Sequence, residues 1–123
     1  SNDMHGDFLA EQIDERLEGF VRRIRESHPT TPLIFLQTEV RESGNFDLKK
    51  RAFEDAKREA ARKGMEKILE TDKNIWFINP GMKLGDDHEA TVDGVHPTDL
   101  GFERMLKKVQ PQIIRILQKH GIK

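Results

Sequence analysis

The chain has 123 residues, with 21 Lys and Arg against 22 Asp and Glu, which gives a formal net charge of -1. Proteins that bind nucleic acid normally carry a basic excess, so this balance argues against that class of partner. The absence of Cys excludes disulfides, thiolate metal sites and a cysteine nucleophile. No apolar run approaches the roughly 18 residues of a membrane span, and the length predicts a single domain over residues 1–123.

The first predicted element is an amphipathic helix between Asp7 and His28. Apolar residues recur there every three or four positions, and charged residues fill the gaps. Pro29 and Pro32 follow and end the helix, because proline lacks the donor that a helix needs. The short apolar run at 33–36 then predicts a strand that is buried on both faces, as in a parallel sheet.

A second helix is predicted to begin after Asp47, a good capping residue, and to run to about Glu70. It presents Ala52, Ala56 and Ala60 at intervals of four. Small residues on one stripe allow a close approach to a neighbouring element, so we expect this stripe to pack against the rest of the fold.

The second predicted strand covers residues 75–78, and the run Asn79-Pro80-Gly81 ends it. A strand, a helix and a strand with this spacing form a crossover connection, which predicts that the two strands are parallel. A final amphipathic helix is predicted from about Leu100, with a bend at Pro111 and a stop at Gly121.

These elements leave the predicted sheet too small. Two parallel strands have two open edges and too little surface to cover three long helices. Another part of the polypeptide, a second copy of the chain, or a weak strand around residues 89–92 would complete the sheet. The open edges also favour self-association into a homo-oligomer.

The residues with the clearest chemical potential are Asp93 and His96, three apart in the loop before the last helix. Gly94 allows a sharp turn and Pro97 sets the backbone for a helix start. Such a turn can fold Asp93 onto the Nδ1–H of His96, which would fix the tautomer and aim Nε2 outward as a general base. The simpler alternative is that Asp93 only closes the turn.

A metal site is another interpretation, because His88 and Glu89 lie close in the sequence to Asp93 and His96. These four residues show no recognised metal-ligand spacing. We therefore predict neither a metal nor a cofactor.

The run Asp93-Gly94-Val95-His96-Pro97, followed by Thr98-Asp99-Leu100-Gly101, resembles the Asp-x-x-His-Pro motif near the carboxyl terminus of SGNH hydrolases, also called GDSL-type esterases. The wider stretch from Leu84 to Phe102 is similar to one bacterial branch of the GDSL-like acylhydrolases, and so is the helix-to-strand junction from Arg25 to Pro32. The resemblance implies a three-layer, flavodoxin-like α/β fold, present here as a partial version with few parallel strands flanked by long helices.

The resemblance also implies a serine ester hydrolase with a Ser-His-Asp triad, acting on acyl or acetyl esters of small molecules or carbohydrates. His96 would be its general base and Asp93 the orienting acid. The family takes an oxyanion-hole donor from the Asn of a Gly-x-Asn-Asp motif, and Asn2 stands at that place. Ser1 and Asn2 are equally well explained as the remainder of an expression tag.

The nucleophile is where the chain departs from the family, because the Gly-Asp-Ser motif is absent. Ser27 lies at a helix end, and Ser43 follows the first strand at the sheet edge where α/β sites lie, but the family does not support a role for it. We expect the carboxyl-terminal portion of an SGNH hydrolase, a truncated domain that is inactive alone. The alternative is a non-catalytic α/β interaction module. The compartment stays open, and the full-length form could be secreted or periplasmic in a bacterium.

Overall fold

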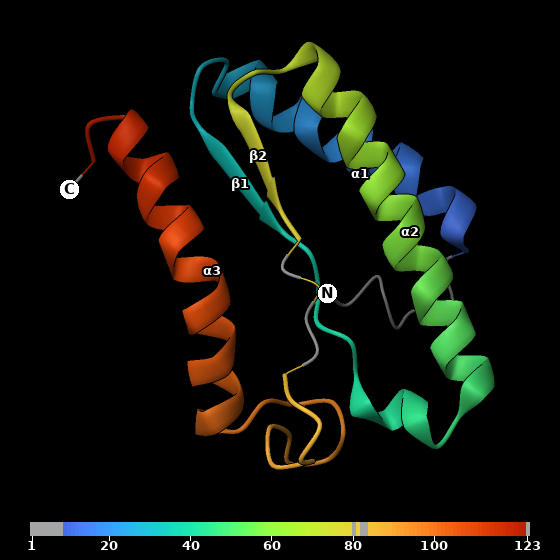
Figure 1. Ribbon diagram of the computed structural model, residues 1–123. Coiled ribbons are helices and arrows are strands. Elements are labelled where there is room, and N and C mark those ends of the chain that lie inside the picture. Colours follow the sequence, from blue (N-terminus) through green and yellow to red (C-terminus); the bar gives the residue numbers. More distant parts are fainter. Residues whose placement is uncertain (1–8, 80, 82–83, 123) are drawn as a thin grey trace. The chain divides into compact units, whose positions relative to one another are not determined.

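The computed structural model describes residues 9–79, 81 and 84–122 (Figure 1). These residues form two compact parts, one within 1–35 and 52–77 and the other within 36–51 and 78–123. None of the described helices is long and apolar enough to cross a membrane. The elements are, in chain order, α1 (Ala10–Ser27), β1 (Leu33–Leu36), the short 3-10 helix η2 (Glu42–Asn45), α2 (Leu48–Thr71), β2 (Ile75–Ile78) and α3 (Asp99–Lys119).

Side-chain caps begin α2 and α3, and a left-handed glycine follows the end of α3. Asp47 caps α2 as predicted, since its Oδ1 accepts the backbone N–H of Lys50 at 3.0 Å. Thr98 caps α3, and its Oγ1 accepts the N–H of Gly101 at 3.2 Å. Helix α3 contains Pro111 and ends just before Gly121, whose φ of +70° lies in the left-handed region typical of a residue that stops a helix.

The sheet consists of β1 and β2. The N–H of Leu33 donates to the carbonyl of Asn74 at 2.9 Å, and the N–H of Gln37 donates to the carbonyl of Ile78 at 2.9 Å. Four residues along one strand therefore correspond to four residues along the other in the same direction, which confirms the predicted parallel pairing. The weak strand considered around residues 89–92 is not found, because Thr91 takes part only in an isolated bridge outside the sheet.

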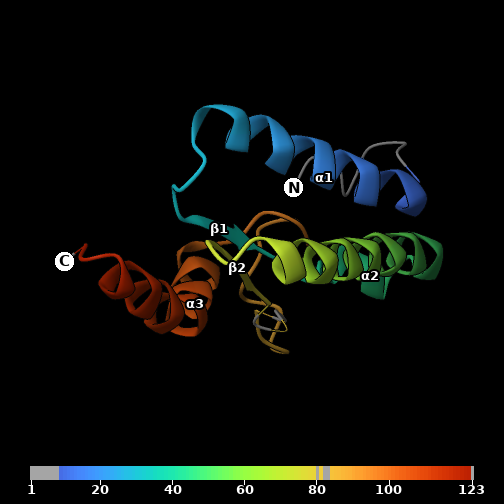
Figure 2. The same ribbon diagram turned by 90° about the horizontal axis from the view of Figure 1, so that it is seen from above.

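The first part has its core where α1 and α2 pack on one face of the strands. Figure 2 shows the two helices side by side, running in the same direction. Burial of these apolar side chains is the main force that holds helices to a sheet face. The core contains Val21, Met65, Ile68 and Ile75, with Leu17, Leu33, Phe35, Leu69 and Phe77 packed around it.

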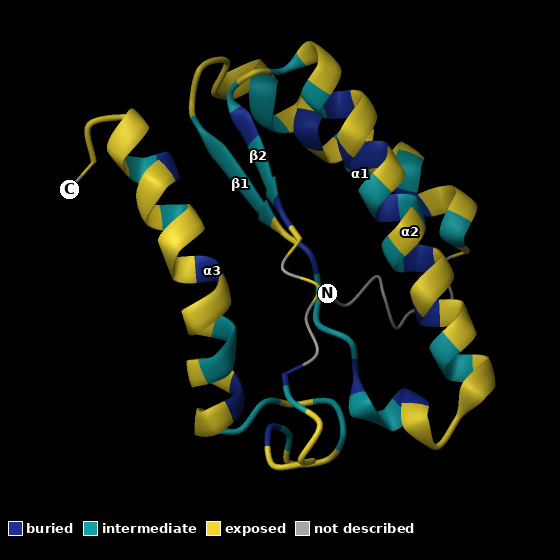
Figure 3. Ribbon diagram, in the orientation of Figure 1, coloured by how far each residue is buried: buried dark blue, intermediate teal, exposed yellow. Residues whose placement is uncertain are grey.

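Strand β1 is less buried than its sequence predicts. None of its four residues is fully buried (Figure 3). The side chain of Leu36 is 42 % exposed. Strand β2 is buried at Ile75 and Ile78 and half-buried between them. The prediction of two buried faces was therefore wrong for β1 in the described residues, because the core formed with α1 and α2 lies against the face of Leu33 and Phe35, and side chains alternate between faces along a strand.

The buried face of α2 is also not the predicted alanine stripe. Ala52 and Ala56 are exposed. Larger apolar side chains remove more surface from water than alanine does, so the helix turns Met65 and Ile68 inward instead. The close approach falls at Gly64, where an added Cβ would lie 2.5 Å from Asp14 Oδ1. The buried residues of α2 are Glu54, Lys57, Ala61, Gly64, Met65 and Ile68.

Candidate active site

The loop that carries Asp93 and His96 belongs to the second part and doubles back on itself. The N–H of Val92 donates to the carbonyl of His96 at 2.9 Å, and the N–H of Thr98 donates to the carbonyl of Ala90 at 3.0 Å. Thr91 and Pro97 form an antiparallel bridge between these two bonds. The backbone thus holds the tip of the loop closed, with Asp93 and His96 on its two arms.

Asp93 makes three hydrogen bonds across this tip. Its Oδ2 lies 2.7 Å from His96 Nδ1. Its Oδ1 accepts the backbone N–H of His96 at 2.8 Å and that of Val95 at 3.0 Å. The contact between carboxylate and imidazole that the spacing predicts is therefore present, together with the turn-closing bonds of the simpler interpretation.

These bonds fix the charge of Asp93. The backbone N–H of His96, followed by the His96 side chain and the N–H of Val95, lowers the pKa of the Asp93 carboxyl to about 2. The carboxylate is ionised at neutral pH and only accepts hydrogen bonds, so Nδ1 of a neutral His96 must carry the ring proton. Nε2 then keeps a free lone pair on a side chain that is 77 % exposed.

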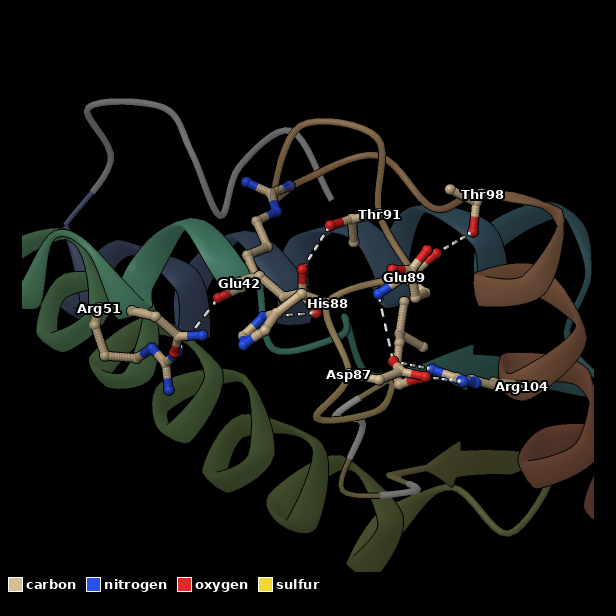
Figure 4. Close-up of polar contacts among 11 residues, drawn as sticks. Glu42, Arg51, Asp87, His88, Glu89, Thr91, Thr98 and Arg104 are labelled. Atoms are coloured by element: carbon tan, nitrogen blue, oxygen red, sulfur yellow. Dashed lines mark hydrogen bonds and ion pairs between the residues drawn. The ribbon is translucent and has the colours of Figure 1, made fainter.

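The η2 turn anchors the loop from one side. The hydroxyl of Thr91 donates to Glu42 Oε2 at 2.8 Å (Figure 4). The N–H of Ser43 donates to the carbonyl of Gly94 at 3.0 Å. Gly94 has a φ of +80°, and an added Cβ would lie only 3.0 Å from the Ser43 nitrogen. Glycine is required there both by the backbone conformation and by this close contact.

Helix α3 anchors the other side of the loop. Arg104 binds Asp87 through two hydrogen bonds of 2.7 and 2.5 Å, and also donates to the carbonyl of Leu84 at 3.0 Å (Figure 4). The Arg104 guanidinium holds the pKa of the Asp87 carboxyl well below its usual range. Gly101 lets α3 approach closely, because a Cβ there would lie 2.1 Å from the carbonyl oxygen of Ala90.

An open hollow of about 360 Å³ lies beside Asp93. Its lining includes Phe46 and Val92, two apolar side chains that are strongly exposed. Apolar side chains in such a hollow are suited to the apolar part of a ligand. Within the described residues, no three His, Asp or Glu side chains gather closely enough to hold a metal ion.

The serines do not complete a triad among the described residues. Ser43 lies next to the Asp93 loop, as its position after β1 predicts, but its Oγ is buried and makes no hydrogen bond. A serine nucleophile needs both access to the substrate and a hydrogen bond to its base. Ser27 is exposed at the end of α1 in the other part. Asn2, the candidate oxyanion donor, lies outside the described residues.

The residues that hold the loop were missed by sequence reasoning. Thr98 had a usable signal, because a hydroxyl residue directly before an amphipathic helix is a typical cap. Glu42 had none, since its partner Thr91 is 49 positions away. The same holds for Arg104, which meets Asp87 across 17 positions.

Comparison with known proteins identifies the family. The model of the GDSL-like lipase/acylhydrolase family matches residues 3–114, whereas no curated protein matches. The chain is similar to the crystal structure of a Bacteroides ovatus protein assigned as a GDSL-like lipase, with 45 % identity and a TM-score of 0.82. That match covers 89 % of this chain and 33 % of the other, so this chain spans about a third of that protein's length. The small parallel sheet with its helices is thus a partial version of the predicted α/β fold. The chain belongs to the GDSL-like lipase/acylhydrolase family.

Proposed function

We propose that this chain supplies the general base and its orienting acid to a serine ester hydrolase. The observation that carries the proposal is the 2.7 Å contact between Asp93 Oδ2 and His96 Nδ1 in a chain of this family. The ionised carboxylate keeps the ring proton on Nδ1, so that Nε2 can accept a proton from a serine hydroxyl. The expected substrates are acyl or acetyl esters of small alcohols or carbohydrates, which could enter the hollow beside Asp93.

The proposed reaction has two steps. The serine Oγ attacks the ester carbonyl while Nε2 of His96 takes its proton, and collapse of the tetrahedral adduct returns that proton to the departing alcohol. Water then loses a proton to Nε2 and attacks the acyl-serine, which releases the acid and restores the hydroxyl. Asp93 stays ionised throughout and stabilises the transient imidazolium.

We infer that the 123 residues alone do not hydrolyse esters above background, because no serine among the described residues meets the requirements of a nucleophile. The test is hydrolysis of p-nitrophenyl acetate by this chain and by its Ser43→Ala and His96→Ala variants. All three are expected at background. Turnover that persists in Ser43→Ala and disappears in His96→Ala would contradict the inference.

The catalytic roles are tested on the protein encoded by the complete gene. His96→Ala and Asp93→Asn are expected to lower kcat for acetyl esters by on the order of 10³-fold or more, as loss of the base or of its correct tautomer does in other triads. His28→Ala is the matched control, since His28 is exposed at the end of α1 and should leave kcat unchanged. Full activity in both His96→Ala and Asp93→Asn would refute the proposed roles of the pair, whereas no ester hydrolysis by the unmodified complete protein would favour the non-catalytic interaction module.

A further inference from the structure

We propose that Glu42 is a positioning residue for the Asp93–His96 pair and acts through the hydroxyl of Thr91. The inference rests on the proposed function, because it concerns the alignment of the same imidazole. Glu42 opens η2 and is far from the loop in sequence, yet its carboxylate receives the Thr91 hydroxyl at 2.8 Å (Figure 4).

The Glu42 carboxylate is mostly buried, although only one of its two oxygens makes a hydrogen bond. Its side chain is 14 % exposed. Oε2 binds Thr91, whereas Oε1 is buried and makes no hydrogen bond. His88 Nδ1 lies 3.8 Å from Oε1, too far for a hydrogen bond but close enough for an ion pair when His88 is protonated. Burying a carboxylate with one oxygen unpaired lowers the stability of the fold. A position that keeps a carboxylate at this cost indicates that the hydrogen bond it accepts from Thr91 is important.

Positive charge near this carboxylate lowers that cost. Arg41, Arg51 and His88 line the same small cavity of about 30 Å³ as Glu42. Arg51 is held there by hydrogen bonds from Nη2 to the carbonyl of Arg41 at 3.3 Å and to Asn45 Oδ1 at 2.7 Å. Asp86 lines the cavity as well, beside these two guanidinium groups. A carboxylate accepts a hydroxyl more strongly than a neutral group does.

The η2 turn makes hydrogen bonds to the loop on both sides of Asp93. Glu42 holds Thr91, two residues before Asp93, and Ser43 holds the carbonyl of Gly94, the next residue. Because Ser43 holds Gly94 in place, a shift of the Thr91 arm would move Asp93 relative to the rest of the tip and change the distance between Asp93 Oδ2 and the imidazole. Through Thr91, the Glu42 carboxylate therefore sets where the carboxylate of the pair lies.

The test reads the tautomer of His96 directly, without any ester or nucleophile. In the ¹⁵N-labelled chain at a pH where His96 is neutral, the ring nitrogen shifts are expected to report a proton on Nδ1. Thr91→Val, which removes the hydroxyl at nearly constant shape, is expected to move most of the population to the Nε2–H tautomer that an unpaired imidazole prefers. Glu42→Leu should do the same, whereas Glu42→Gln keeps an oxygen acceptor for Thr91 and should restore the Nδ1–H form.

The control is Thr71→Val, because the Thr71 hydroxyl also makes one hydrogen bond, to the carbonyl of Ile68 at 3.1 Å in the other part. It should leave the His96 shifts unchanged, although it can lower stability. If Thr91→Val does not give a dispersed amide spectrum, Glu42→Leu against Glu42→Gln decides. An unchanged tautomer in Thr91→Val or in Glu42→Leu overturns the positioning role, and equal loss in both Glu42 variants overturns it as well. Absence of the Nδ1–H form in the unmodified chain would instead count against the proposed function.

Discussion

Asp93 makes two hydrogen bonds to His96. Its Oδ2 lies 2.7 Å from the ring Nδ1, and its Oδ1 accepts the backbone N–H of the same residue at 2.8 Å. One carboxylate therefore closes the turn and orients the imidazole at the same time. The two roles that the sequence offered as alternatives are compatible here, because the two carboxylate oxygens serve them separately.

The first prediction concerns the acid titration of Asp93. Its pKa of about 2 lies below the usual 3.8. Because the pKa of Asp93 is lower in the folded state than in the unfolded state, its ionised carboxylate stabilises the fold above about pH 4. This stabilisation is lost as the pH falls towards 2. A ¹³C titration of the Asp93 carboxyl should give that low midpoint.

His96→Ala provides the control for this titration. It removes the ring but keeps the backbone N–H that contributes most to the shift, so the Asp93 pKa should rise only part of the way to its usual value. A midpoint near 4 in the unmodified chain would show that the turn is not closed in solution.

The second prediction concerns the packing of α3 against the loop. Gly101→Ala places a Cβ 2.1 Å from the carbonyl oxygen of Ala90, a backbone atom that cannot move alone. We expect the variant to lose about 1–3 kcal/mol of unfolding free energy in urea titrations. The control is Gly19→Ala in α1, where nothing lies within 4 Å of the added Cβ. That variant should gain about 0.5–1 kcal/mol from helix propensity. Equal effects of the two substitutions would argue against the close approach.

The third prediction concerns Arg25, which lies near the end of α1 and makes hydrogen bonds to the segments that precede β1 and β2. It donates to Asp72 Oδ2 at 2.6 Å and to the carbonyls of His28 and Thr31 at 2.9 and 2.7 Å. Its side chain is only 15 % exposed. Lysine cannot reproduce this fork of donors, so Arg25→Lys should cost roughly 1.5–3 kcal/mol.

Arg23→Lys is the matched control for Arg25, since Arg23 pairs with Glu26 on the exposed surface of the same helix. It should change the unfolding free energy by less than about 0.5 kcal/mol. Arg25 also lowers the pKa of Asp72, so the difference between Arg25→Lys and the unmodified chain should shrink as the pH falls below about 4. A constant difference across that range would place the effect in packing instead.

The fourth prediction concerns Pro111, which lies inside α3 on its exposed side. Proline removes one helical hydrogen bond and crowds the preceding turn, so Pro111→Ala should stabilise α3 by about 1 kcal/mol or more. Slower amide exchange in α3 would report the gain. Gln110→Ala, an exposed neighbour, should leave these exchange rates nearly unchanged, and faster exchange in Pro111→Ala would reveal a packing role for the ring.

Features that depend on near neighbours can be read from the amino-acid sequence. The strands at 33–36 and 75–78, the cap at Asp47 and the Asp93–His96 contact follow from apolar runs, side-chain chemistry and a three-residue spacing. The motif around His96 also resembles the family whose model matches the chain. Such features can be predicted because their partners are already close along the chain.

Features that depend on distant partners are visible only in the packed structure. The inward face of α2, the exposure of β1 and the bond from Thr91 to Glu42 each depend on which surfaces meet. Burial goes to the face that removes the most apolar area from water, and that area is defined only once the elements have packed. A hydrogen bond across 49 positions likewise has no local pattern, since either residue alone is an ordinary polar side chain.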